Sequence, residues 1–173
     1  IIFFAARHLR LVAWNLREYA RFKRTATYAA LRGTNAAVSL MSLPLTLAMS
    51  VNVLFVLGGV FVPGLWNIVE YLFPVSISAL LAIGALSLRT FLDLFARALA
   101  GGHFDCTRNN HLSQLQAVMT FTMVAVGLAA PAAMSTQQVT IAVSILASVF
   151  FLGAAALMGV ILLVLGFRGM LAH

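Results

Sequence analysis

Apolar residues fill two long stretches of this chain without a single charge. Residues 33–69 and 112–167 contain no Asp, Glu, Lys or Arg. A helix needs about 20 apolar residues to cross a bilayer, so the first stretch holds one crossing and the start of a second, and the second stretch holds two. Polar or proline-containing breaks at 63–67 and 134–138 separate the crossings. The pattern predicts an all-α integral membrane protein with two transmembrane hairpins, whose four spans are 36–62, 66–100, 112–134 and 139–167.

The first 32 residues follow a different pattern, a basic stripe on a helix. Arginines recur at helical spacings between residues 1 and 24, and apolar side chains lie on another face of the same predicted helix. One interpretation is an amphipathic helix on anionic lipid, and the other is a cytoplasmic extension of a preceding span. The chain therefore divides into a basic juxtamembrane segment, 1–32, and a transmembrane domain, 33–173. The stripe comprises Arg7, Arg10, Arg17, Arg21 and Arg24, and the other face comprises Leu9, Val12, Leu16 and Tyr19.

Composition and charge agree with a membrane location. Hydrophobic residues make up 62% of the chain and charged residues 9%, against roughly 45–50% and 25% in soluble domains. The net charge is +7, and residues 1–32 hold seven basic residues and one acid. With four spans, every Lys and Arg lies at one membrane face, which the positive-inside rule makes cytoplasmic. This concentration argues against nucleic-acid binding and predicts a bacterial inner-membrane protein with both ends of the segment cytoplasmic.

Charged residues mark both ends of the second predicted span. Glu70 lies at its outer end, and no acidic residue lies at mid-membrane depth. Arg89, Asp93 and Arg97 follow one another at intervals of four, which predicts a ladder of salt bridges on a solvated helix face. The lack of a buried carboxylate argues against a proton-coupled transporter.

The spans carry hydroxyl and amide side chains in rows at helical spacing. Such rows hold helices together through small residues and hydrogen bonds, or they line a path in which uncharged donors and a positive mouth suit an anion. Both interpretations remain open. Phe121 lies beside one row and is a candidate gate, although an aromatic residue in a span more often packs or meets lipid. The rows are Ser39, Ser42, Thr46 and Ser50; Ser113, Gln116 and Thr120; and Thr140, Ser144 and Ser148.

The polar loop between the predicted hairpins contains reactive side-chain types. Their spacing matches no strong zinc signature, and the histidines all fall outside the spans, so we expect neither a metal nor another cofactor. Cys106 is the one cysteine, which excludes an intramolecular disulfide. It is either a redox-active thiol, its pKa lowered by nearby cations, or a passive loop residue. The loop residues of interest are His103, Asp105, Cys106, Arg108 and His111.

Several short motifs lie from residue 31 onward. They are Leu31-Arg32-Gly33-Thr34-Asn35, Leu43-Pro44-Leu45-Thr46-Leu47-Ala48-Met49, Phe61-Val62-Pro63-Gly64-Leu65-Trp66, His103-Phe104-Asp105-Cys106 and Asn109-Asn110-His111-Leu112-Ser113-Gln114. Together these motifs resemble the TsoY family of membrane (seleno)proteins. Some members of that family carry selenocysteine, and the resemblance implies that Cys106 is the residue here that could occupy such a position.

The proline-interrupted, hydroxyl-bearing hairpins and Tyr71-Leu72-Phe73-Pro74 are also similar, more distantly, to the tellurite-resistance/dicarboxylate transporter family. The TehA-like members of that family are ten-helix, typically trimeric anion channels with a phenylalanine gate. The resemblance implies a homo-oligomer and a chain of about ten helices, of which this segment supplies two hairpins. The opening Ile1-Ile2-Phe3-Phe4, which lacks Met, also leads us to expect a preceding apolar segment.

These patterns predict a membrane channel or transporter for a small anion, with a sulfur or selenium oxyanion as one candidate. The alternatives are a non-transporting anchor subunit of a larger complex and a membrane redox protein that uses Cys106. An enzymatic role is the weaker expectation, because the spans hold no constellation typical of catalysis.

Overall fold

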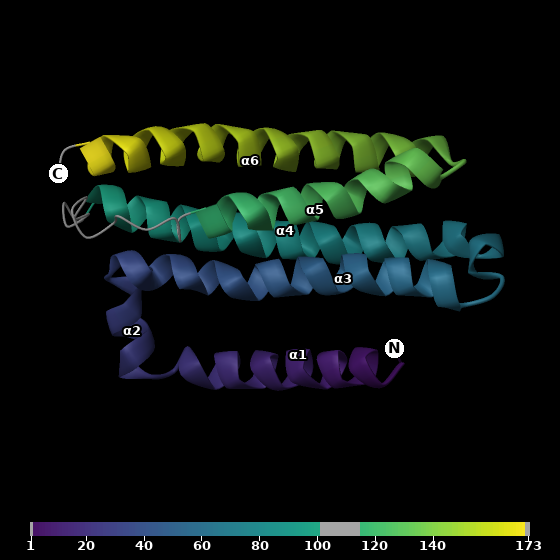
Figure 1. Ribbon diagram of the computed structural model, residues 1–173, viewed down its shortest axis with the longest axis horizontal. Helices are drawn as coiled ribbons and strands as arrows, with labels where there is room; N and C mark the ends of the chain where they lie inside the picture. The colour runs from purple at the N-terminus through teal and green to yellow at the C-terminus, as the bar shows by residue number, and fades with distance from the viewer. Residues whose placement is uncertain (1, 101–114, 172–173) are drawn as a thin grey trace.

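The structure, a computed structural model, describes residues 2–100 and 115–171 and is helical throughout its regular elements. Four long helices lie side by side with their axes along the molecule, and the first helix lies below them (Figure 1). The α-helices are α1 (Ile2–Phe22), α2 (Ala26–Arg32), α3 (Ser42–Phe61), α4 (Val69–Ala100), α5 (Leu115–Met134) and α6 (Gln138–Leu171), and two short 3₁₀ helices, η1 (Asn35–Met41) and η2 (Leu65–Asn67), precede α3 and α4.

Within residues 2–100 and 115–171, four helical segments are long and apolar enough to cross a membrane, which confirms the predicted number. They are Ala36–Phe61, Val69–Arg97, Leu115–Met134 and Gln138–Val164. The predicted segments 36–62 and 66–100 each begin with a 3₁₀ turn instead of an α-helical turn. Pro44 stands in the first turn of α3, where its missing N–H leaves no helical bond unmade. Gly64, with φ of 75°, forms the left-handed corner between α3 and η2.

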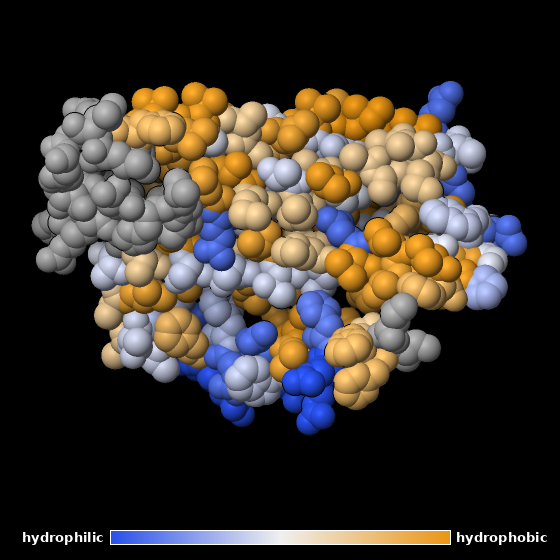
Figure 2. Space-filling view, in the orientation of Figure 1, coloured by the Kyte–Doolittle hydropathy of each residue, from blue (hydrophilic) through white to orange (hydrophobic). Residues whose placement is uncertain are grey.

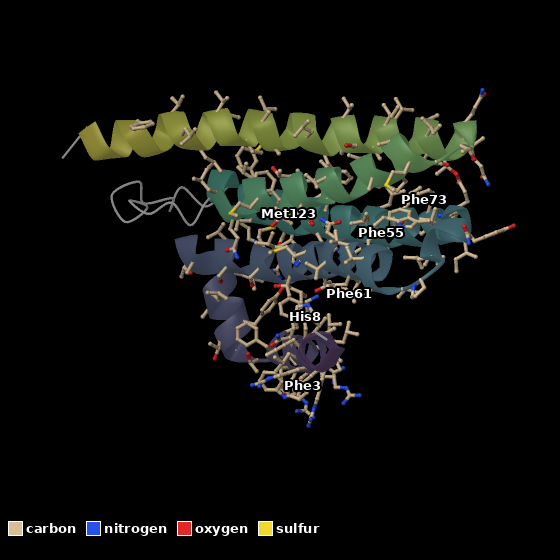
Figure 3. All side chains as sticks on the ribbon, turned by 45° about the vertical axis from the view of Figure 1, so that its right-hand side comes forward. Phe3, His8, Phe55, Phe61, Phe73 and Met123 are labelled. Atoms are coloured by element: carbon tan, nitrogen blue, oxygen red, sulfur yellow. The ribbon has the colours of Figure 1, made fainter. Side chains whose placement is uncertain are left out.

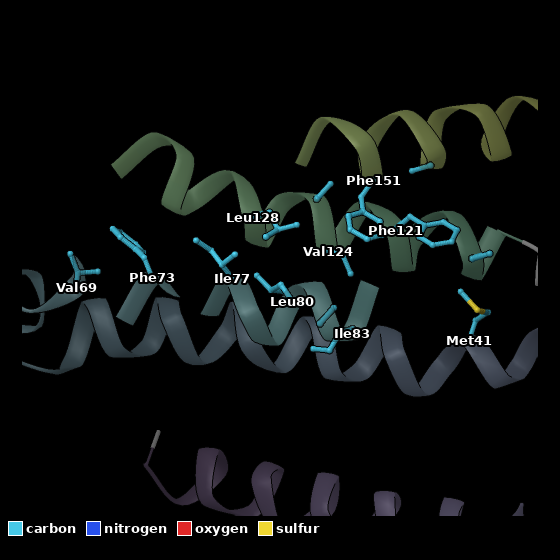
Figure 4. Close-up of a cluster of buried hydrophobic side chains, with 14 residues drawn as sticks. Met41, Val69, Phe73, Ile77, Leu80, Ile83, Phe121, Val124, Leu128 and Phe151 are labelled. Carbon is cyan, nitrogen blue, oxygen red and sulfur yellow. The ribbon is translucent and has the colours of Figure 1, made fainter. Parts of the chain in front are cut away.

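The core of the bundle lies where α3, α4, α5 and α6 meet. Its largest fully buried side chains include Phe73, Phe121 and Leu80 (Figure 4). Two glycines allow the helices to approach closely. A Cβ on Gly84 would lie 2.2 Å from the ring of Phe151, and one on Gly127 would lie 2.3 Å from Oδ1 of Asn52. Side chains therefore fill the bundle interior tightly.

The outer face of α6 remains open over most of its length. Large apolar side chains such as Val139, Leu146 and Phe150 are more than half exposed. Figure 2 shows hydrophobic residues along this edge and hydrophilic residues at the opposite edge, over α1. Without lipid or other protein, so much apolar surface would not be stable in water, which agrees with a membrane-embedded bundle.

Candidate functional site: the groove between α1 and α3

The hydroxyl row of α3 lies on the side of the bundle that faces α1. Thr46 donates to the Ser42 carbonyl at 2.8 Å, and Ser50 donates to the Thr46 carbonyl at 2.7 Å. Bonds of this kind, to a carbonyl four residues back, are how Ser and Thr are accommodated in apolar helices. Ser39, in η1, and Ser42 are exposed, Thr46 is half-buried and Ser50 is buried.

A groove of about 340 Å³ runs between α1 and the first half of α3. Ser42 and Thr46 form part of its α3 wall, and Asn15, Glu18 and Tyr19 form the polar part of its α1 wall. The remaining lining is apolar and comprises Val12, Phe22, Leu43 and Leu47. Two hydroxyls, an amide, a phenol and a carboxylate therefore meet in one open space.

A second space, of about 270 Å³, lies further along the same two helices. Its walls are apolar and comprise Phe4 and Ala5 of α1 and Val53, Leu54 and Leu57 of α3, together with His8. Along α3, Ser50 lies between the residues that line the two spaces. Nε2 of His8 is 2.8 Å from Oγ of Ser50, and Figure 3 shows His8 rising from α1 toward α3. Since the Ser50 proton goes to Thr46, the imidazole N–H is the donor in this contact.

The charges around the groove are mostly positive. Arg7, Arg10 and Arg17 of α1 are exposed and do not line the groove. Glu18, the one carboxylate in the groove wall, is held by Arg21 at 2.7 Å. Burial, followed by the neighbouring Tyr28, raises the pKa of Tyr19 to about 12, so its phenol remains a neutral donor at physiological pH.

The predicted polar residues of α5 and α6 lie elsewhere, inside the bundle. Gln116 is half-buried, and its carbonyl accepts a 2.7 Å bond from the fully buried Thr120, whose hydroxyl is also 3.4 Å from the Met41 carbonyl. Thr140 and Ser144 are buried too, and the Ser144 hydroxyl has no hydrogen-bond partner among the described residues. Of the described residues in the three rows, Ser42 and Thr46 of α3 border an open groove, whereas Thr120, Thr140 and Ser144 are buried.

Phe121, the candidate gate, lies in the packed core. Its ring stacks on Phe151 with centroids 6.2 Å apart, and it makes a T-shaped contact with Phe91 with centroids 5.8 Å apart. The residue is 1% exposed (Figure 4). In this arrangement Phe121 joins α4, α5 and α6.

The predicted loop residues His103, Asp105, Cys106, Arg108 and His111 lie outside the described residues, as does Ser113. Within residues 2–100 and 115–171, no group of three His, Cys, Asp or Glu side chains is placed to hold a metal ion. The candidate site consequently rests on the groove alone.

Three polar contacts between helices were not expected from the sequence. Asp93 pairs with Arg97, as predicted, but its second cation is Arg32 of α2 and not Arg89. Glu70 accepts bonds from the Ser135 hydroxyl at 2.8 Å and from the backbone and side chain of Thr136. Asn52 donates to the Met123 carbonyl at 2.9 Å, and Figure 3 labels Met123 above α3. All three are far apart in sequence, so helical spacing gives no signal for them.

Comparisons with protein-family models, with curated proteins and with solved structures give no significant match for this chain. The candidate site is therefore argued from its own geometry.

Proposed function

We propose that the protein is part of a membrane channel or transporter for a small anion, and that the hydroxyl row of α3 forms one wall of the path. The observation that carries the proposal is the groove in which Ser42 and Thr46 face Asn15 and Tyr19. The hydroxyl protons of Thr46 and Ser50 are now bonded to carbonyls of their own helix. A bond of this kind is worth about 1 kcal/mol net, so a hydroxyl can turn toward a passing ion at small cost.

The charge distribution supports an anion over a cation as the transported species. In the predicted topology, the basic side chains lie at the cytoplasmic membrane face, where they raise the local concentration of anions. Glu18 would repel an anion, but Arg21 compensates its charge. Small oxyanions of sulfur or selenium are one candidate class, because hydroxyl, amide and phenol donors suit oxyanions.

The path would lie beside the four-helix bundle, since large side chains fill the bundle interior. Further helices would then have to close the groove, as in a longer chain of about ten helices or a homo-oligomer such as a trimer. We also propose that the membrane is a bacterial inner membrane and that both ends of the segment lie on its cytoplasmic side.

Anion flux into liposomes containing the purified protein tests the proposal. Thr46→Val keeps the side-chain shape and removes the donor, and it is expected to lower flux by about fivefold, the equivalent of one hydrogen bond of about 1 kcal/mol. Thr122→Val is the matched control, because Thr122 makes the same type of bond, to the Val118 carbonyl at 2.9 Å, on α5. Equal flux in both variants and in the wild type would place the path away from α3.

The alternative is a non-transporting anchor subunit, and the tight packing of the bundle interior favours it. Wild-type protein that carries no anion flux and co-purifies with a partner would support this alternative. A redox role for Cys106 is tested by Cys106→Ser, which would then abolish activity.

A further inference from the structure

In the structure, α1 occupies space beside α3 that lipid would occupy if α3 spans a bilayer. Residues of α1 line spaces that extend along α3 from Ser42 to Leu57, which covers most of the candidate span Ala36–Phe61. In Figure 1 α1 lies below α3, and in Figure 3 it is seen almost end-on while α3 to α6 still extend across the view, so it crosses them obliquely. If α3 spans a membrane, α1 in this position lies at membrane depth.

The charges of α1 make that depth unfavourable. Its arginines are exposed and line neither of the spaces beside α3, and each arginine at the centre of a bilayer disfavours insertion by roughly a hundredfold. Accordingly, α1 is not among the described helices that are apolar enough to span. The exposed basic residues of α1 and the following turn are Arg7, Arg10, Arg17, Arg21, Lys23 and Arg24.

The attachment of α1 to α3 is loose. Two spaces of about 270 and 340 Å³ separate the helices, and side chains that border a gap lose their dispersion contacts. The hydrogen bond between His8 and Ser50 is the polar contact that joins them among the described residues. By contrast, Arg32 ties α2 to Asp93 of α4, so the turn at 23–25 connects a loosely held helix to a fixed one.

We infer that α1 is a binding surface for anionic lipid headgroups, and that lipid binding takes it off α3 and uncovers the hydroxyl row. Leu9, Val12 and Leu16 lie on one face, as an interfacial helix requires, although α3 now engages only Val12 of the three. Trp14 is 57% exposed and suits the headgroup layer. The row of arginines complements the negative charge of the lipid.

Binding of anionic lipid by α1 does not depend on whether the protein transports anything. The second part of the inference, that release of α1 opens a transport path, rests on the proposed function. In that function, α1 covers the groove in neutral lipid and leaves it in anionic lipid. The transport activity would consequently require anionic lipid.

Distance measurement by paired spin labels tests the inference on the full chain. Labels are placed at the exposed positions of Ala13→Cys in α1 and Ala85→Cys in α4, with Cys106→Ser, and the protein is reconstituted in bilayer discs. Phosphatidylcholine alone offers no anionic headgroups to α1, so part of the population is expected to keep the distance of the docked helix. Addition of phosphatidylglycerol is expected to produce a second population of molecules with a different distance between the labels. High salt is expected to make this second population smaller, because it screens the attraction between the arginines and the lipid.

The triple variant Arg7→Gln, Arg10→Gln and Arg17→Gln separates lipid binding from other causes. Each arginine contributes roughly a fivefold change in affinity for an anionic surface, so the ratio of released to docked α1 should fall by roughly a hundredfold. Arg89→Gln, an exposed arginine on α4, is the control and should leave the ratio unchanged.

Identical distance distributions in both lipids, or a lipid effect that persists in the triple variant, would overturn the inference whatever the flux. Release by phosphatidylglycerol without any anion flux would uphold the lipid surface and overturn the proposed function. Flux that is equal in both lipids would overturn the link between α1 release and the path.

Discussion

Two helix interfaces in this molecule differ in how closely they pack. Where α4, α5 and α6 meet, glycines bring the helices so close that an added methyl group would overlap Phe151 or Leu80. Where α1 meets α3, two open spaces remain, and the imidazole–hydroxyl bond between His8 and Ser50 is the polar contact found among the described residues. The first interface resembles a permanent core and the second a contact that can be exchanged for another.

The comparison teaches which polar residues serve stability and which remain available. Thr120 and Ser144 are enclosed by the tight interface, where a hydroxyl has no access to a ligand. Thr46 forms the same type of backbone bond as Thr120 but borders an open space. The distinction lies in the packing of the neighbouring helix and not in the residue type.

The largest expected effect comes from Phe121→Ala in the tight interface. Removal of a fully buried ring should lower the free energy of unfolding by about 3–5 kcal/mol. Phe150→Ala is the control, because Phe150 is 56% exposed and an exposed side chain contributes little. Denaturant titration in mixed micelles measures both. Equal stability of the two variants would contradict a packed core at Phe121, and a rise in flux without loss of stability would favour its role as a gate.

Gly84→Ala should have the next largest effect. The new Cβ would lie 2.2 Å from the Phe151 ring, and overpacking of this kind costs about 1–3 kcal/mol. Gly153→Ala meets no atom within 4 Å and should be neutral or stabilising by up to about 1 kcal/mol. The same titration compares them, and a Gly84 variant as stable as the Gly153 variant would show that α4 and α6 do not approach this closely.

Asp93→Asn should act mainly on the segment that precedes α3. The exchange weakens the pairs with Arg32 and Arg97, and partly exposed pairs are worth less than about 1 kcal/mol. We expect little change in global stability but faster trypsin cleavage at Lys23 and Arg24, because α2 loses its tie to α4. Glu18→Gln, which removes a local pair within α1, is the control. Cleavage rates that match in the two variants would argue against this anchoring role.

The smallest change in stability is expected for Ser50→Ala, which removes the bond to His8. The free energy of unfolding should change by less than about 1 kcal/mol, yet hydrogen exchange in residues 2–22 should become faster. Ser78→Ala is the matched control, since Ser78 bonds only the Pro74 carbonyl. If exchange in α1 is as slow in Ser50→Ala as in the control, another contact holds α1 on α3.

The sequence predicted the helices well because a long uncharged stretch in a bilayer has few alternatives to a helix that satisfy its backbone hydrogen bonds. It could not place the polar rows. A serine or threonine bonded to its own helix is equally satisfied toward lipid, core or groove, so Thr120 in the core and Thr46 at the groove look alike in the sequence. Nor could it find His8 and Ser50, which are 42 positions apart, because helical periodicity relates only residues within a turn or two. For Asp93, local spacing identified Arg97 but not Arg32, which arrives from another helix.

The carboxylate of Glu70 has a consequence for how the protein is made. Residues 62–70 and 131–139 form the turns at one end of the bundle, and Glu70 is the single charged residue in them. Its partners, Ser135 and Thr136, come 65 and 66 positions later. Because a chain is synthesised from its N-terminal end, Glu70 is made before either of its partners. The hydrogen bonds of Glu70 with Ser135 and Thr136 therefore form only when the second hairpin packs against the first. Formation of these bonds reports that the two hairpins have assembled.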